Sequence, residues 1–240
     1  MRLLLGGRLA PITSTVGFLE APLDDAVRAF VDWDRSVHEP LGVSVTRRPV
    51  TGGLEEALLS LLPLTSVVRR RHLFVPTAGP WVAFFDNGHR GTDAFSVMSY
   101  LAQGLRCRGM SVTAVPDTIE GEFVGARGQY GGLVLEVYGP ERTHFLNYVR
   151  SISLVNDGGS WDFSQNGTPF PFEDVSRYSA RRKRDRFTFE MLERYLSELG
   201  LSPFEEEFYL PDSAGAAQLV ERLGPAPPGM REYTLADCVL

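Results

Sequence analysis

Residues 145–163 read FLNYVRSISLVNDGGSWDF, and this stretch decides the fold class. Two β-prone runs, 145–155 and 161–163, flank the turn sequence Asn156-Asp157-Gly158-Gly159. Asn, Asp and Gly tolerate the backbone conformations that tight hairpin turns require. The stretch therefore predicts an antiparallel β-hairpin, and the β-prone run at 133–138 predicts a further strand in the same part of the chain.

The segments outside this hairpin predict both helices and strands. Apolar residues recur at helical spacing in some segments and alternate or cluster as in strands in others. The helical segments are 22–40, 54–63, 92–109 and 188–199, and the strand segments are 43–46, 71–76, 81–85 and 110–115. Mixed elements, then strands, then helices are typical of the α+β class. We therefore expect a mixed, largely antiparallel sheet with helices packed on one face and a helical C-terminal segment.

Length and composition predict one main domain. A chain of 240 residues, 43% hydrophobic and 22% charged, can bury a core without metals or disulfides. No linker-like stretch divides its first 212 residues, so we expect residues 1–212 to form a single α+β domain. Residues 224–229 read GPAPPG, which neither a helix nor a sheet accommodates well. We expect residues 213–240 to form a short helix and a loosely attached, Pro/Gly-rich C-terminal tail.

Charge, cysteine content and the N-terminal sequence bear on the class of protein. The net charge of -6 disfavours general nucleic-acid binding, and no apolar run is long enough to span a bilayer. The leucine run at 3–5 is too short for the core of a secretory signal, and Cys107 and Cys238 form no CxxC motif. These features predict a reduced, cytoplasmic protein without membrane association, and they leave its oligomeric state undecided.

The segment Asp86-Asn87-Gly88-His89-Arg90-Gly91-Thr92-Asp93 is a candidate small-molecule site. It is a polar turn between an apolar strand and a helix, and such turns present backbone N–H groups to anions. Asp86, His89 and Asp93 have side chains suited to approaching a metal, or to acid–base chemistry in which Asp86 orients His89 as a base. Arg90 is suited to clamping an anion. The alternative interpretation is a tight turn with a helix N-cap, because its glycines match no phosphate-binding loop.

No recognisable catalytic or cofactor motif accompanies this turn. The chain has no GxSxG, HExxH or GxGxxG pattern, and its four histidines stand far apart. The sequence therefore predicts neither a cofactor nor a metal site, and it disfavours an enzyme. A glycine-rich region is suited either to cradling an anion or to forming a plain loop. It contains Gly121, Gly125, Gly128, Gly131 and Gly132, with Arg127 among them.

A basic run, Arg181–Arg186, lies close in sequence to the aromatic residues Tyr178, Phe187 and Phe189. Such a run is suited to contacting phosphates, but its acidic neighbours favour ion pairs along a solvated surface. Whether this run joins Arg69–Arg71 in one patch is not decided by the sequence.

The acidic and aromatic segment 204–209 predicts a protein-binding surface. Charge beside aromatic area is typical of contact surfaces and also of docked terminal segments. A small acidic α+β chain without a catalytic signature is similar to bacterial toxin-immunity and inhibitor-type proteins. The first hypothesis is therefore a cytoplasmic protein-binding module of that type that engages another, basic protein. The second is a small-ligand-binding protein or enzyme with its site at the turn 86–93. The predicted binding residues are Phe204, Glu205, Glu206, Glu207, Phe208 and Tyr209 for the first hypothesis and Arg90 for the second.

Overall fold

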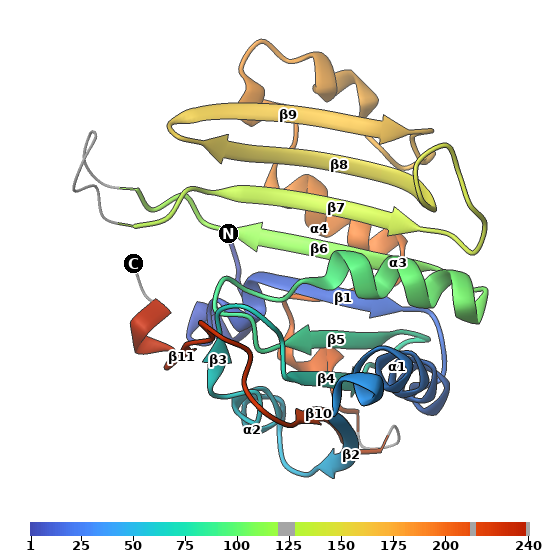
Figure 1. Ribbon diagram of the computed structural model, residues 1–240. Helices are drawn as coiled ribbons and strands as arrows, with labels where there is room; N and C mark the ends of the chain where they lie inside the picture. The colour runs from blue at the N-terminus through green and yellow to red at the C-terminus, as the bar shows by residue number, and fades with distance from the viewer. Residues whose placement is uncertain (120–127, 212–214, 239–240) are drawn as a thin grey trace.

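A nine-stranded sheet forms the centre of the computed structural model, which describes residues 1–119, 128–211 and 215–238 (Figure 1). The strands are β1 (Thr15–Leu19), β2 (Ser44–Val50), β4 (Arg71–Pro76), β5 (Val82–Asp86), β6 (Gly109–Val115), β7 (Gly132–Tyr138), β8 (Tyr148–Asp157), β9 (Ser160–Gly167) and β10 (Ala217–Leu223). Their order is β2-β10-β4-β5-β1-β6-β7-β8-β9, and each neighbouring pair is antiparallel. The α+β class and the largely antiparallel sheet are thus confirmed.

Short elements surround this sheet. The α-helices are α1 (Leu23–His38), α2 (Leu54–Leu59), α3 (Ala94–Leu105) and α4 (Phe189–Glu198). The 3-10 helices are η1 (Leu4–Gly7), η2 (Ile12–Ser14), η3 (Glu39–Leu41), η4 (Val175–Ser179), η5 (Lys183–Asp185), η6 (Glu206–Phe208) and η7 (Ala236–Cys238). Two further strands, β3 (Leu64–Thr65) and β11 (Glu232–Tyr233), pair with each other in a separate sheet. Among the helices of the described ranges, none is long and apolar enough to cross a membrane.

The predicted hairpin is the pair β8 and β9. Asp157 pairs with Ser160, and the two glycines between them have φ angles of 62° and 95°. A two-residue turn with positive φ at both positions matches the right-handed twist of the flanking strands. The local turn chemistry therefore sets the register of these strands.

Helices lie on both faces of the sheet, whereas we expected them on one. Figure 1 shows α3 in front of β1 and β6 and α4 behind the sheet. β4 and β5 are apolar at consecutive positions, so Phe74 and Phe84 belong to the core under α1 and α3, while Leu73 and Phe85 belong to the core under α2 and α4. Strands with two apolar faces need cover on both, and the helices supply it.

β10 replaces the short helix that we expected outside the main domain. It lies between β2 and β4 and pairs with both, so the boundary expected at residue 212 divides a single sheet. Leu219 and Val220 are fully buried and point into the cores on opposite faces. Consecutive apolar residues fit a strand that is covered on both sides. Periodicity alone does not distinguish so short an apolar run from a buried helix.

Candidate functional site

The turn 86–93 is held together by the carboxylate of Asp86. This side chain is buried at the end of β5, and its two oxygens accept the backbone N–H groups of Gly88 at 2.8 Å and Asp93 at 2.9 Å. The carboxylate that accepts a hydrogen bond from the backbone at the start of α3 is thus that of Asp86. The side chain of Asp93 is exposed and does not cap the helix. Both oxygens are engaged by the backbone, so Asp86 has an architectural role in the turn.

The electrostatic environment of Asp86 is shaped by burial and by Arg69. Burial raises the pKa of the Asp86 carboxyl to about 6, although Arg69 and the two N–H donors act in the opposite direction. The Nε atom of Arg69 lies 3.7 Å from Oδ1 of Asp86, beyond ordinary hydrogen-bond distance. Desolvation of the charged carboxylate therefore outweighs the attraction to the guanidinium.

His89 is oriented by β3. Its Nδ1 lies 3.2 Å from the carbonyl oxygen of Thr65, and its backbone N–H donates to the same oxygen at 3.1 Å. Its ring stacks on that of Tyr233 in β11, with the centroids 4.9 Å apart and the planes 14° apart. The predicted use of Asp86 to orient His89 as a base is therefore replaced by contacts to β3 and β11.

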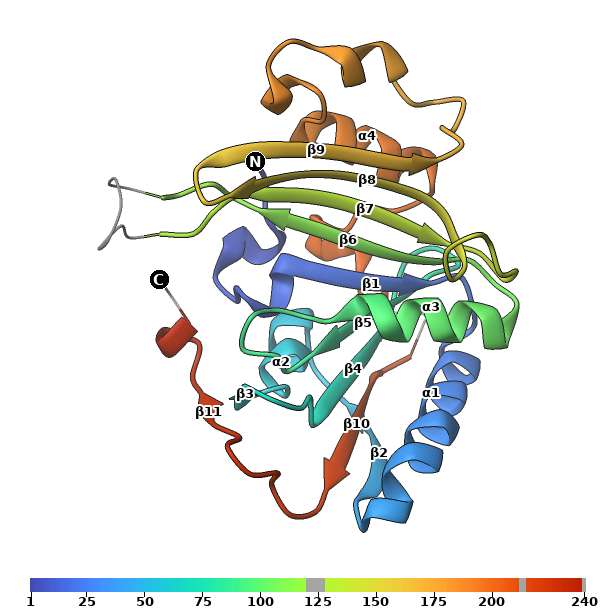
Figure 2. The same ribbon diagram turned by 45° about the horizontal axis from the view of Figure 1, so that its top comes forward.

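Three segments that are distant in sequence meet beside His89. β3 pairs with β11, and the backbone N–H groups of Ser66 and Arg231 reach across the same junction at 3.1 and 2.9 Å. Figure 2 shows the C-terminal segment leaving β10, curving away from the sheet and returning to lie beside β3 as β11. This path places Arg231 near the turn that carries His89 and Arg90.

A hollow of about 630 Å³ opens at this junction, and we call it the basic hollow. Its lining contains three arginines and a histidine but no carboxylate side chain. The ion pairs of the described residues include neither Arg90 nor Arg231, both of which are exposed. A protein with net charge -6 thus carries a local concentration of cations here. The lining consists of Ser66, Val67, Arg69, His89, Arg90, Gly229, Arg231 and Tyr233.

Arg69 lies against the turn because residue 88 is glycine. A Cβ at position 88 would lie 2.6 Å from the carbonyl oxygen of Gly91 and 2.9 Å from Nε of Arg69. This Nε is buried, and among the described residues it has no hydrogen-bond partner. The nearest carboxylate oxygen to this Nε is Oδ1 of Asp86 at 3.7 Å, so the nitrogen faces the turn and not the open hollow.

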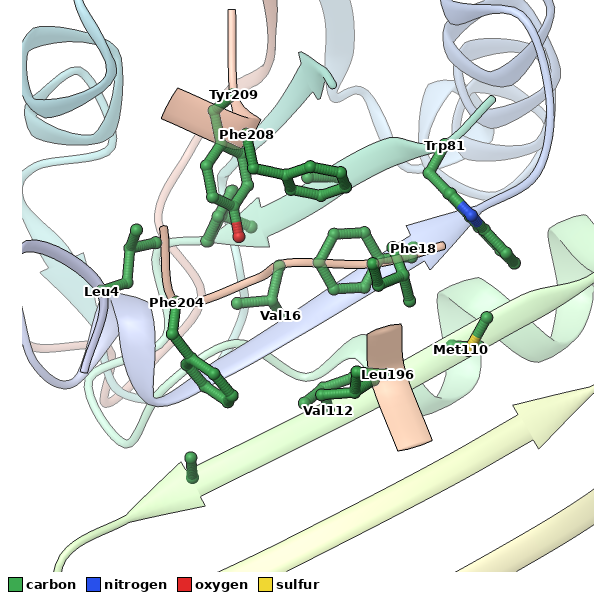
Figure 3. Close-up of a cluster of buried hydrophobic side chains, with 14 of the residues drawn as sticks. Leu4, Val16, Phe18, Trp81, Met110, Val112, Leu196, Phe204, Phe208 and Tyr209 are labelled. Atoms are coloured by element: carbon green, nitrogen blue, oxygen red, sulfur yellow. The ribbon is translucent and has the colours of Figure 1, made fainter. Parts of the chain in front are cut away.

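The predicted acidic and aromatic surface is divided by the fold. Phe204, Phe208 and Tyr209 are buried, and Figure 3 shows their rings among the buried side chains around β1. The Phe208 and Phe18 ring centroids are 6.4 Å apart, and the Tyr209 hydroxyl donates to the carbonyl oxygen of Pro203 at 2.8 Å. These aromatic residues belong to the core because their segment docks on the sheet, so they cannot form the predicted contact surface.

The acidic part of that segment remains on the surface. Glu205, Glu206 and Glu207 are exposed, and Glu205 forms an ion pair with Arg2 at 3.0 Å. The other two carboxylates take part in no ion pair within the described ranges. The surface expected from the sequence is thus reduced to its charged residues.

The two basic runs lie at different places on the sheet. Arg71 is on β4, whereas the run Arg181–Arg186 lies beside β9, where Lys183 pairs with Asp162 at 3.0 Å. β5, β1, β6, β7 and β8 lie between β4 and β9 in the sheet. The runs therefore do not form one patch. Of the glycine-rich region predicted as an anion loop, Gly121, Gly125 and Arg127 lie outside the described residues.

Comparison of the chain with models of protein families, with characterised proteins and with solved structures finds no significant match. The described residues also contain no group of three or more His, Cys, Asp or Glu side chains placed to hold a metal ion. The geometry and charge of the basic hollow are therefore the features that point to a function. Sequence reasoning selected His89 and Arg90 but did not connect Arg69, Arg231 and Tyr233 with them.

Proposed function

We propose that the protein binds a small anionic ligand in the basic hollow. The observation that carries this proposal is the convergence of Arg69, Arg90 and Arg231 on a lining without a carboxylate. Guanidinium groups present planar sets of N–H donors that match carboxylate and phosphate oxygens.

The charge distribution supports binding over a purely structural role. Like charges that face one hollow repel each other, and this repulsion lowers the stability of the unliganded fold. Some exposed arginines elsewhere in the protein reduce such costs by pairing, as Arg8 does with Glu55 at 2.8 Å and Arg106 does with Glu141 at 2.8 Å. In the basic hollow, a bound anion would supply the missing negative charge.

The turn offers Asp86 no part as a base, because both of its oxygens accept backbone N–H groups. An Nδ1–H of His89 that donates to the carbonyl oxygen of Thr65 leaves Nε2 as the free nitrogen of the ring. The arginines of the hollow favour the small-ligand-binding half of the second hypothesis, and the contacts of His89 do not decide between its two halves.

Thermal unfolding in inorganic phosphate tests the proposal. Phosphate at a fixed ionic strength should raise the Tm of the wild type, because a ligand that binds the native state stabilises it. The double variant Arg90→Gln/Arg231→Gln should lose most of this response. Arg177→Gln is the matched control, since Arg177 is also exposed but lies in η4 near the β9 end of the sheet. An equal response in all three proteins would refute the proposal, because it would reflect a general salt effect.

Binding of a basic protein partner is a second candidate function, of the toxin-immunity or inhibitor type. It is favoured by the exposure of Glu206 and Glu207 without ion pairs in the described part of the chain. Charge reversal of both residues to lysine should abolish co-purification of a stoichiometric partner at moderate salt. Reversal of the exposed Glu198 should not. Equal recovery of the partner with both variants would count against this surface.

A further inference from the structure

The basic hollow has room for more than one anionic group. Its volume is about 630 Å³, and it is open to solvent. The kind of ligand that fits therefore depends on the positions of its cations.

The cations of the hollow come from three separate segments. Arg69 lies between β3 and β4, Arg90 lies in the turn between β5 and α3, and Arg231 directly precedes β11. The Nε of Arg69 is buried against the turn, whereas Arg90 and Arg231 are exposed. Donors on different segments and at different depths are suited to several anionic groups, because each guanidinium pairs best with its own set of oxygens.

We infer that the ligand of the basic hollow is a small polyanion of the diphosphate class, with one charged group at Arg69 and Arg90 and another at Arg231. This inference rests on the proposed function and adds the chemical class of the ligand. Such a ligand would connect the turn 86–93 with the C-terminal segment. Tyr233 stacks on His89 at the same junction and closes one side of it.

The attachment of the C-terminal segment gives this inference a second consequence. β11 is held by two residue pairs with β3, Glu232 with Thr65 and Tyr233 with Leu64. Beside them, the Ser66 N–H donates to the Arg231 carbonyl oxygen, and the Arg231 N–H donates to the Ser66 hydroxyl. Segments with so few hydrogen bonds open locally at low free-energy cost. A ligand that bridges Arg231 to the turn should therefore slow amide hydrogen exchange in residues 229–235.

Isothermal titration with phosphate and with pyrophosphate, at matched ionic strength, tests the inference. For the wild type and the Arg177→Gln control, we expect pyrophosphate to bind at least tenfold more tightly than phosphate. For Arg231→Gln, we expect this preference to fall to threefold or less while phosphate binding persists. The Arg231 side chain makes no hydrogen bond within the described residues, so its replacement should leave the fold intact, as circular dichroism would verify.

The outcomes separate the two proposals. Equal affinity of the wild type for phosphate and pyrophosphate would overturn the polyanion inference and leave anion binding standing. A tenfold preference that persists in Arg231→Gln would overturn the assignment of the second charged group to the C-terminal segment. Failure of both anions to bind the wild type would remove the proposed function and the inference together. Slower exchange in residues 229–235 with pyrophosphate, and not with phosphate, would support the inference independently.

Discussion

Replacement of Arg150 by methionine is a demanding test of the core at the β8–β9 end of the sheet. Arg150 lies on β8, and its guanidinium is fully buried. Its Nε and Nη2 donate to the two carboxylate oxygens of Glu173 at 2.8 and 2.6 Å. Its Nη1 donates to the carbonyl oxygens of Asn166 and Gly167 at 2.8 and 3.2 Å. One side chain thus joins β8, β9 and the segment that follows them.

The expected loss of stability follows from the carboxylate that is left behind. Methionine fills much of the arginine stem but provides no charge, so Glu173 stays buried without its cation. Breaking a buried ion pair in this way costs about 3–5 kcal/mol of unfolding free energy. Burial raises the pKa of Glu173, but hydrogen bonds from Arg150 and Tyr178 hold it below its usual value in the wild type. Without Arg150 that pKa should rise, so the destabilisation should be larger at pH 7 than at pH 4.

Urea unfolding followed by tryptophan fluorescence measures this loss. The double variant Arg150→Met/Glu173→Gln should be less destabilised than the single variant, because the glutamine is uncharged and still offers an acceptor to Tyr178. Arg106→Met is the matched control: Arg106 pairs with Glu141 on the surface, and its loss should cost under about 1 kcal/mol. A single variant within about 1 kcal/mol of the wild type, or a double variant worse than the single one, would refute this reasoning.

Three further perturbations test the turn, a buried histidine and β10. Gly88→Ala should lower the Tm and weaken the phosphate response, because the new methyl group would clash with the carbonyl oxygen of Gly91 and with Arg69; an unchanged response would show that the position of Arg69 does not matter. Burial, and secondarily the charge of Arg222, lowers the pKa of His72 below its ordinary value of 6.5. Protonation of this histidine therefore favours the unfolded state, and the fold loses stability as the pH falls below 6.5. In urea titrations, His72→Phe should therefore lose less stability than the wild type between pH 7 and pH 5. Equal losses in the two proteins would show that His72 is not the group responsible. Leu219→Ala should cost about 2–5 kcal/mol, whereas truncation of the half-exposed Leu223 should cost far less; similar effects on the urea midpoint would show that β10 is not part of the core.

Elements defined by local chemistry could be predicted from the sequence. The β8–β9 turn is specified by its two glycines, and α4 is capped by Thr188, whose hydroxyl accepts the N–H of Met191 at 3.3 Å. β10 could not be predicted in this way, because its place between β2 and β4 depends on pairing with residues 144 to 179 positions earlier. Leu219 and Val220 show that a strand buried on both faces carries no alternating pattern.

The candidate site was predictable in part for the same reason. His89 and Arg90 were found because they lie in one turn between a strand and a helix. Arg231 was not connected with them, because the β3–β11 pairing that brings it near is two residues long and joins positions far apart in the chain. In the segment 204–209, composition alone did not indicate which side chains are exposed. Phe208 points into the core and Glu207 to solvent.

The position of β10 has a consequence for how the chain folds during synthesis. β2 is complete once residue 50 has been made and β4 once residue 76 has been made, yet the strand that joins them ends at residue 223. Until that residue leaves the ribosome, the edges of β2 and β4 that β10 will cover are both open to other strands. A nascent chain stalled before residue 217 would expose these edges together, and it would therefore be a target for chaperones or a seed for aggregation.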